Sequence, residues 1–247
     1  MSENSKTALL VGAGDAIGAA VARRFAAGGY SVCIARRDPA KSSELVEELT
    51  RAGGEVHAFA VDARREAEVQ ELCERVEREI GPIEVCLFNA GSNVKKELHE
   101  TSEKLFFKAW ELACLAGFLV GREATRHMLR RGRGTMLFTG ATASVRGGSG
   151  FAAFASAKFG LRAVAQAMAR ELGPKNIHVA HLLIDAGVDS PAIHQRMKAA
   201  TGVEASDIPP DSLTRTSSIA EAYWFLHQQS RDGWSHELDL RPSVEKW

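Results

Sequence analysis

The stretch Thr7-Ala-Leu-Leu-Val-Gly-Ala-Gly-Asp-Ala-Ile-Gly18 begins as an apolar run and ends in a glycine-rich loop. Apolar residues in succession, without alternation, predict a strand that is covered on both faces. A helical pattern follows directly, over residues 19–27. Glycines in such a loop allow a tight turn and let a pyrophosphate approach the N-terminus of the helix, where free N–H groups and the helix dipole favour anions. The stretch therefore predicts a nucleotide-binding loop rather than a plain strand-to-helix turn.

Apolar runs of the same kind recur along the chain and alternate with long amphipathic segments such as residues 64–80. We expect seven strands, at residues 7–12, 30–36, 55–61, 83–88, 134–140, 177–184 and 234–240. Strands that alternate with helices of a dozen residues or more form βαβ units. The fold class expected is therefore α/β, with a seven-stranded, doubly wound parallel sheet and helices on both faces. Residues 185–217, which carry three prolines, are the least regular part, and we expect an irregular lid there.

Composition excludes several classes of protein. The 247 residues are 45% hydrophobic and 25% charged, which is ordinary for one large globular domain spanning residues 1–247. Basic and acidic residues balance at 31 each, so we expect no nucleic-acid or membrane partner. The four cysteines lack CxxC or zinc-like spacing, which predicts buried free thiols, no metal site and a reducing cytosol. Residues 1–6 lack a signal-peptide pattern and no apolar run is long enough to span a membrane, so a cytoplasmic protein is expected.

The end of the second expected strand carries two arginines, Arg36 and Arg37. A carboxylate at this point suits the ribose hydroxyls of NAD, whereas cations suit the 2′-phosphate of NADP. The alternative is a pair of solvated surface arginines. We expect NADP(H) in preference to NAD(H), because a site for a free 2′-hydroxyl gains nothing from two cations.

Over nearly its whole length the chain resembles the short-chain dehydrogenase/reductase family, whose members have a single-domain Rossmann fold. The glycine loop matches, with Ala16 in place of the family's middle glycine, and so do Asp62, Asn89-Ala-Gly91 and Ser190. Asp185-Ala186 replaces the Pro-Gly that usually precedes the last of these. The residues that the loop and the resemblance assign to the cofactor are Gly12, Gly14, Asp15, Ile17, Gly18, Arg36, Arg37, Asp62, Ala63, Asn89, Ala90, Gly91, Lys158, Val188 and Ser190.

The resemblance also implies an Asn–Ser–Tyr–Lys catalytic set, and three of its four positions are replaced here. Phe154 stands at the tyrosine, Ala141 at the serine and Cys114 at the asparagine, while Lys158 is retained. Phenylalanine has no proton to donate. We therefore expect an NADP(H)-binding oxidoreductase with weak or altered chemistry on an unknown carbonyl or alcohol substrate. The alternative is a catalytically silent NADP(H)-binding sensor or partner subunit.

Other side chains are candidates for the missing groups, although structural roles are the simpler interpretation of each. These candidates are Thr142, Ser144, Ser156, Asp185, His178, His181 and Cys114. Both tyrosines, Tyr30 and Tyr223, are expected to lie away from the catalytic edge.

Subunit contacts are inferred from the resemblance. It implies a homodimer or homotetramer formed through helices at residues 110–131 and 150–173 and through the last strand. Trp234 and Trp247 suit a subunit contact, with core packing as the alternative for Trp234.

Overall fold

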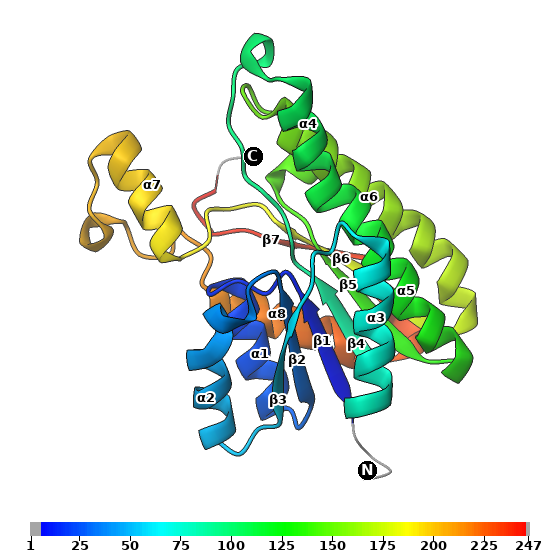
Figure 1. The fold of residues 1–247 in the computed structure, drawn as a ribbon. Coiled ribbons are helices and arrows are strands. Elements are labelled where there is room, and N and C mark those ends of the chain that lie inside the picture. Colours follow the sequence, from blue (N-terminus) through cyan, green and yellow to red (C-terminus); the bar gives the residue numbers. More distant parts are fainter. Residues whose placement is uncertain (1–5, 246–247) are drawn as a thin grey trace.

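The computed structural model describes residues 6–245, and seven strands within this range form one parallel sheet. The order of the strands is β3-β2-β1-β4-β5-β6-β7, which confirms the predicted fold class (Figure 1). The strands are β1 (Thr7–Val11), β2 (Ser31–Arg36), β3 (Val56–Ala60), β4 (Ile83–Phe88), β5 (Gly134–Thr139), β6 (Ile177–Ile184) and β7 (Glu237–Leu240).

Helices cover both faces of this sheet, with α1, α2 and α8 on one side and α3, α5 and α6 on the other (Figure 1). Their bounds are α1 (Ile17–Ala27), α2 (Ser43–Arg51), α3 (Glu66–Arg75), α4 (Glu103–Trp110), α5 (Ala116–Arg131), α6 (Ala152–Leu172), α7 (Pro191–Thr201) and α8 (Thr216–Gln228). A π-helical turn, Glu111–Leu115, joins α4 to α5. None of the helices among residues 6–245 combines the length and the hydropathy that a membrane span requires.

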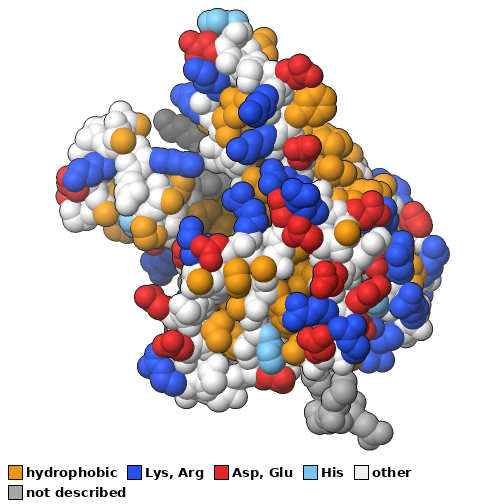
Figure 2. Space-filling model, viewed as in Figure 1, with side chains coloured by type: hydrophobic (Ala, Val, Ile, Leu, Met, Phe, Trp, Pro, Cys, Tyr) orange, Lys and Arg blue, Asp and Glu red, His pale blue; other side chains and the backbone are white. Residues whose placement is uncertain are grey.

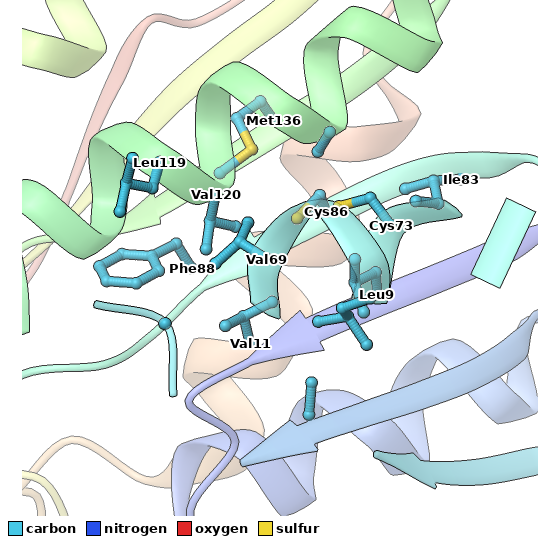
Figure 3. Close-up of a cluster of buried hydrophobic side chains, with 14 of the residues drawn as sticks. Leu9, Val11, Val69, Cys73, Ile83, Cys86, Phe88, Leu119, Val120 and Met136 are labelled. Carbon is cyan, nitrogen blue, oxygen red and sulfur yellow. The ribbon is translucent and has the colours of Figure 1, made fainter. Parts of the chain in front are cut away.

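Apolar side chains fill the space between the sheet and each helical layer. Figure 3 shows part of one cluster, where Leu9 and Phe88 from the strands meet Val69 and Val120 from the helices. Strands β1 and β4 are buried along their whole length, as their mainly apolar sequences predict. Burial of a large apolar side chain contributes ~1.5–3 kcal/mol, so this packing holds the strand ends in place. All four cysteines are buried free thiols, as predicted.

Three expectations about local structure need correction. Residues 185–217 are not irregular throughout, because helix α7 forms after Ser190 with Pro191 at its first position. The last strand starts at Glu237 rather than at residue 234. The helix expected over residues 64–80 ends its α-helical part at Arg75 and finishes as a π-helical turn.

The strand order places a crevice at one edge of the sheet. The chain leaves β1 toward β2 on one side, and β4 lies on the other side of β1. Loops that follow adjacent strands therefore diverge at the carboxyl ends of β1 and β4, which is where open α/β sheets bind ligands. Helix α7 projects beside this edge, away from the body of the molecule (Figure 1).

Candidate functional site

A groove of about 730 Å³ opens at the carboxyl ends of β1, β2 and β4. Thirteen of the fifteen residues assigned to the cofactor from sequence line it: Gly12, Gly14, Asp15, Ile17, Arg36, Arg37, Asp62, Ala63, Asn89, Ala90, Gly91, Val188 and Ser190. Gly18 packs beneath the loop, and Lys158 lines an adjoining chamber. The groove thus gathers residues that lie far apart in the sequence. Figure 2 shows a hollow between the α7 segment and the body of the molecule, with Lys and Arg side chains at its rim.

The loop between β1 and α1 has the shape that a pyrophosphate requires. Gly12 has a φ of +78°, and a Cβ there would lie 2.5 Å from the Ala90 backbone nitrogen. A Cβ at Gly18 would lie 2.5 Å from the Cα of Ala13, so the first helical turn packs tightly under the loop. At Gly14, by contrast, a Cβ would meet no described atom within 4 Å, which leaves open space above the backbone. Within residues 6–245 no side chain caps the N-terminus of α1; the N–H of Ala19 donates to the Gly14 carbonyl oxygen, and the N–H groups of the first two helical residues face the loop, where an anion can accept from them.

Several charged side chains surround the end of the groove near β2. Arg36 donates from Nη1 to Asp15 Oδ1 at 2.7 Å, so a loop carboxylate offsets part of its charge. Arg37 and Lys41 line the groove as further cations, together with Arg196 from α7. The sequence reasoning missed Lys41 and Arg196. Residue 41 lies five positions after the second strand, close enough in sequence to have been considered, whereas Arg196 reaches the groove only through the placement of α7.

Asp62 stands in the groove with its carboxylate already paired. Arg64 donates from Nε to Asp62 Oδ1 at 2.8 Å, and this pairing holds the pKa of Asp62 down at about 2. The N–H of Asp62 donates to Glu68 Oε2 at 2.7 Å. The residue is therefore placed as the sequence predicts, but its polar groups have intramolecular partners.

A chamber of about 500 Å³ adjoins the groove and shares Asn89, Gly91 and Val188 with it. Phe154, Lys158 and Ala141 all line this chamber, so three of the four positions that the resemblance equates with the catalytic set are brought together. The fourth is not, because Cys114 packs against Gly160 of α6, where a Cβ would lie 2.7 Å from its Sγ. Most of the remaining wall is apolar, and it includes Phe151 and Ile193.

Lys158 is a buried cation in this chamber. Its Nζ donates to the Thr139 carbonyl oxygen at 2.8 Å, and burial lowers the pKa of the amine to about 8. In the described part of the chain no carboxylate oxygen lies within 4.0 Å of Nζ. Because its pKa of about 8 lies above neutral pH, Lys158 is mostly protonated at pH 7. This charge lies beside a cavity that can hold a ligand.

The sequence predicted that Tyr223 lies away from the carboxyl ends of β5 and β6, and this prediction is wrong. Tyr223 contacts Thr139, the last residue of β5. Its hydroxyl lies 2.7 Å from Thr139 Oγ1, which in turn donates to Asn89 Oδ1 at 2.9 Å. Asn89 then donates from Nδ2 to the Gly12 carbonyl oxygen at 3.2 Å. This series of hydrogen bonds ties α8 to the ends of β5, β4 and β1. Tyr223 itself is fully buried in the core beneath the sheet, and burial raises the pKa of its hydroxyl.

The hydroxyl candidates for the missing groups already have partners within the protein. Thr142, next to Ala141, donates to Asp185 Oδ1 at 2.5 Å. Ser144 is buried and accepts from the N–H of Ala141, and Ser156 donates to a carbonyl oxygen of its own helix. Thr142 does line the chamber, whereas the two serines serve local backbone structure.

The remaining candidates for the missing catalytic groups are two histidines and a cysteine, and each makes contacts within the protein core. His178 stacks on Trp234 with ring centroids 4.9 Å apart, which favours core packing for that tryptophan. His181 pairs with Glu237, and burial lowers its pKa to about 4. Burial raises the pKa of the Cys114 thiol, which makes it a poor nucleophile. Trp247 lies outside the described residues.

Arg146 lines the chamber and was not singled out from sequence. It follows β5 by a short turn, and its Nη2 lies 3.5 Å from Asp185 Oδ1. Asp185 is buried and also pairs with Arg241, at 3.2 Å. Its carboxylate therefore belongs to an ion-pair network at the edge of the chamber. The only available signal was position, since the loop after a central strand ends at the carboxyl edge of the sheet.

Residues 6–198 match the family model described as short chain dehydrogenase. The chain belongs to this family. An uncharacterized oxidoreductase of Bacillus subtilis, YuxG, is 32% identical over 88% of the chain, which spans about a third (33%) of that relative's length. A short-chain dehydrogenase from Rhodopseudomonas palustris is 47% identical, with a TM-score of 0.83 over 97% of this chain and 99% of that one. An alcohol dehydrogenase from Thermococcus sibiricus, complexed with 5-hydroxy-NADP, is 25% identical, with a TM-score of 0.84 over 98% of this chain and 99% of that one. The chain is thus an oxidoreductase by family.

Proposed function

We propose that this short-chain dehydrogenase binds NADP(H) in the groove and acts on a carbonyl or alcohol substrate in the chamber. The observation that carries the proposal is the continuity of the two cavities around Asn89, Gly91 and Val188, with the glycine loop at one end and Lys158 at the other. A dinucleotide is long enough to span such a site. The segment 185–217 acts as its lid in this proposal, which is supported by the contribution of Val188, Ser190 and Arg196 to the groove wall.

Each part of the groove suits one part of the cofactor. The uncapped N-terminus of α1 and the open space above Gly14 accept the pyrophosphate. Lys158, buried and without a carboxylate partner among the described residues, donates to the nicotinamide ribose hydroxyls. Ser190, at the start of α7, offers its hydroxyl to the carboxamide. These roles follow the family pattern, residue by residue.

The chemistry proposed is slower than is usual for the family. When bound, NADPH supplies a hydride to the substrate carbonyl carbon, and the carbonyl oxygen then takes up a proton. Phe154 and Ala141 offer no donor to that oxygen, and a positioned general acid is worth ~10²–10⁴ in rate. The Lys158 ammonium remains to stabilise the developing negative charge. Because two donors are missing, a silent NADP(H)-binding sensor or partner subunit is the second candidate.

A preference for NADP(H) over NAD(H) rests on the cations at the adenosine end. Arg37 and Lys41 line the groove there, and the contact of Lys41 Nζ with Asp38 Oδ2, at 4.0 Å, is longer than the 2.7 Å contact of Arg36 with Asp15. A 2′-phosphate carries about two negative charges and accepts hydrogen bonds from both. Similarity to the alcohol dehydrogenase complexed with 5-hydroxy-NADP supports the same choice.

We further propose a homodimer or homotetramer in the cytoplasm. Phe118 of α5 and Phe159 of α6 are exposed apolar side chains on the helices that the family resemblance assigns to subunit contacts, and Phe107 is exposed on α4, which leads into α5. Figure 2 shows hydrophobic side chains along the outer side of α4 and α6. An apolar patch of this kind is typical of an interface. The four buried free thiols suit a reducing compartment.

The test is a fluorescence titration of the purified protein with NADPH and NADH, followed by a screen of carbonyl and alcohol substrates. Saturable binding of NADPH is expected, tighter than that of NADH. Failure to bind either cofactor would contradict both candidate functions. Binding without turnover of any substrate would favour the silent protein.

A further inference from the structure

We infer that Arg146 selects substrates that carry a carboxylate, so that the chamber takes oxo acids or the corresponding hydroxy acids. This inference rests on the proposed function, because it names the substrate class of the same site.

The ionisable side chains in the wall of the chamber are all basic among the described residues. They are Lys158 and Arg146. The rest of the wall is mainly apolar, with Phe151 and Phe154 next to each other at a ring-centroid distance of 6.5 Å. A cavity with two cations and aromatic surfaces suits a ligand that has an apolar body and an anionic group. Lys158 lies at the nicotinamide end, which leaves Arg146 for the anionic group.

The contacts of Arg146 leave most of its donors available. Its contact with Asp185 is long, at 3.5 Å from Nη2 to Oδ1. That same carboxylate already accepts a 2.5 Å hydrogen bond from Thr142 and pairs with Arg241 at 3.2 Å. The guanidinium has five N–H donors, and a carboxylate can accept two of them side by side.

The two arginines that pair with Asp185 differ in the exposed fraction of their side chains. The side chain of Arg241 is 17% exposed, whereas that of Arg146 is 49% exposed. Arg241 also pairs with Asp239, so two carboxylates hold it in the protein. Arg146 is therefore the member of the network that faces the cavity and that a ligand can reach. Asp185 contacts Arg146 only through the one long hydrogen bond among the described residues, which leaves the other donors of Arg146 to a ligand.

The experiment uses matched acids and esters as probes. Benzoylformate and 3-benzoylpropionate, each with its methyl ester, are titrated by calorimetry into the protein with and without saturating NADPH. We expect the better-binding acid to bind at least about tenfold more tightly than its ester, because a hydrogen-bonded charge pair is lost in the ester. Arg146→Gln removes that preference, and Arg146→Lys restores it in part, since a lysine keeps the charge but not the paired donors.

Two controls separate this inference from the proposed function and from general charge effects. Arg130→Gln alters an exposed arginine at the far end of α5 and is expected to keep the preference for acids. NADPH affinity, measured in parallel, is expected to change by less than about threefold in Arg146→Gln. Three results would overturn the inference: equal affinity of acid and ester, an unchanged preference in Arg146→Gln, or no binding of either acid. If NADPH still bound in such a case, the proposed function would not be affected. An acid preference that depends on Arg146, without any NADPH binding, would instead contradict the proposed function.

Discussion

Phe154 and Lys158 lie one turn apart on α6, and both line the same chamber. The spacing of four residues puts their side chains on one face of the helix. The lysine keeps its place against the Thr139 carbonyl oxygen, at 2.8 Å, although its neighbour offers no hydroxyl. On the proposed function, this helix keeps a residue that contacts the cofactor and has no proton donor at the position of Phe154.

Arg37→Ala is expected to weaken NADPH binding by about tenfold or more and NADH binding by less than about threefold. The physical reason is the loss of a cation beside the 2′-phosphate, which only NADPH carries. Dissociation constants from fluorescence titration measure both effects. Arg51→Ala, at the exposed end of α2, is the matched control. Equal weakening of the two cofactors would exclude a role in 2′-phosphate recognition.

Asp15→Asn is expected to tighten NADPH binding severalfold. Asp15 accepts a 2.7 Å hydrogen bond from Arg36 and offsets its charge, so a neutral amide makes that arginine available to the phosphate. The same titration measures the change. NADPH binding that becomes weaker in this variant would show that Asp15 positions Arg36 rather than competing with the cofactor.

NADPH affinity is expected to fall as the pH rises above about 8. Burial lowers the pKa of Lys158 to about 8. The amine is therefore mostly protonated at pH 7, and its charge is progressively lost as the pH rises above 8. If binding requires the protonated amine, the dissociation constant rises by up to about tenfold per pH unit above pH 8 and is flat below it. Lys158→Gln should bind more weakly at pH 7 and lose this pH dependence. A pH dependence that persists in the variant would assign the titration to another group.

Tyr223→Phe is expected to destabilise the fold by about 1 kcal/mol, because a buried hydrogen bond to Thr139 Oγ1 is lost. Urea unfolding measures the change. Cofactor affinity and any turnover should stay close to those of the wild type, since Tyr223 lies beneath the sheet and its hydroxyl faces the core network. Loss of turnover with unchanged stability would instead make Tyr223 a participant in proton transfer.

Phe107→Lys combined with Phe118→Lys is expected to shift the protein from dimer or tetramer toward monomer in light-scattering chromatography. Phe118 is exposed on a helix assigned to subunit contacts and Phe107 on the helix that leads into it, and lysine opposes the burial of either. Phe225→Lys changes an exposed side chain on α8 and serves as the control. Elution of the wild-type protein as a monomer would contradict the proposed dimer or tetramer.

Local sequence predicts those parts of the molecule that depend on near neighbours in the chain. The buried strands follow from continuous apolar runs, and the pyrophosphate loop follows from glycines between a strand and a helix. The position of Tyr223 was mispredicted because its hydroxyl meets Thr139 only after α8 packs against the sheet.

Arg146 was missed for a similar reason. Its side chain is available to the chamber because Asp185, which it contacts, also pairs with Arg241. These three residues lie far apart in the sequence. Helix α7 was also missed, because prolines in its neighbourhood obscured a helix whose first residue is itself proline.

We propose that this chain keeps a cofactor site but lacks the groups that donate a proton to the substrate. The most direct measurement compares NADPH oxidation by the wild type and by Phe154→Tyr/Ala141→Ser over one panel of carbonyl substrates, with NADPH affinity measured in parallel. Phe225→Tyr, which adds a phenol elsewhere, is the control. We expect the double variant to exceed the wild type by about 10²-fold or more in kcat/KM, with NADPH affinities within about threefold. Wild-type turnover equal to that of the double variant, at equal NADPH affinity, would contradict the claim.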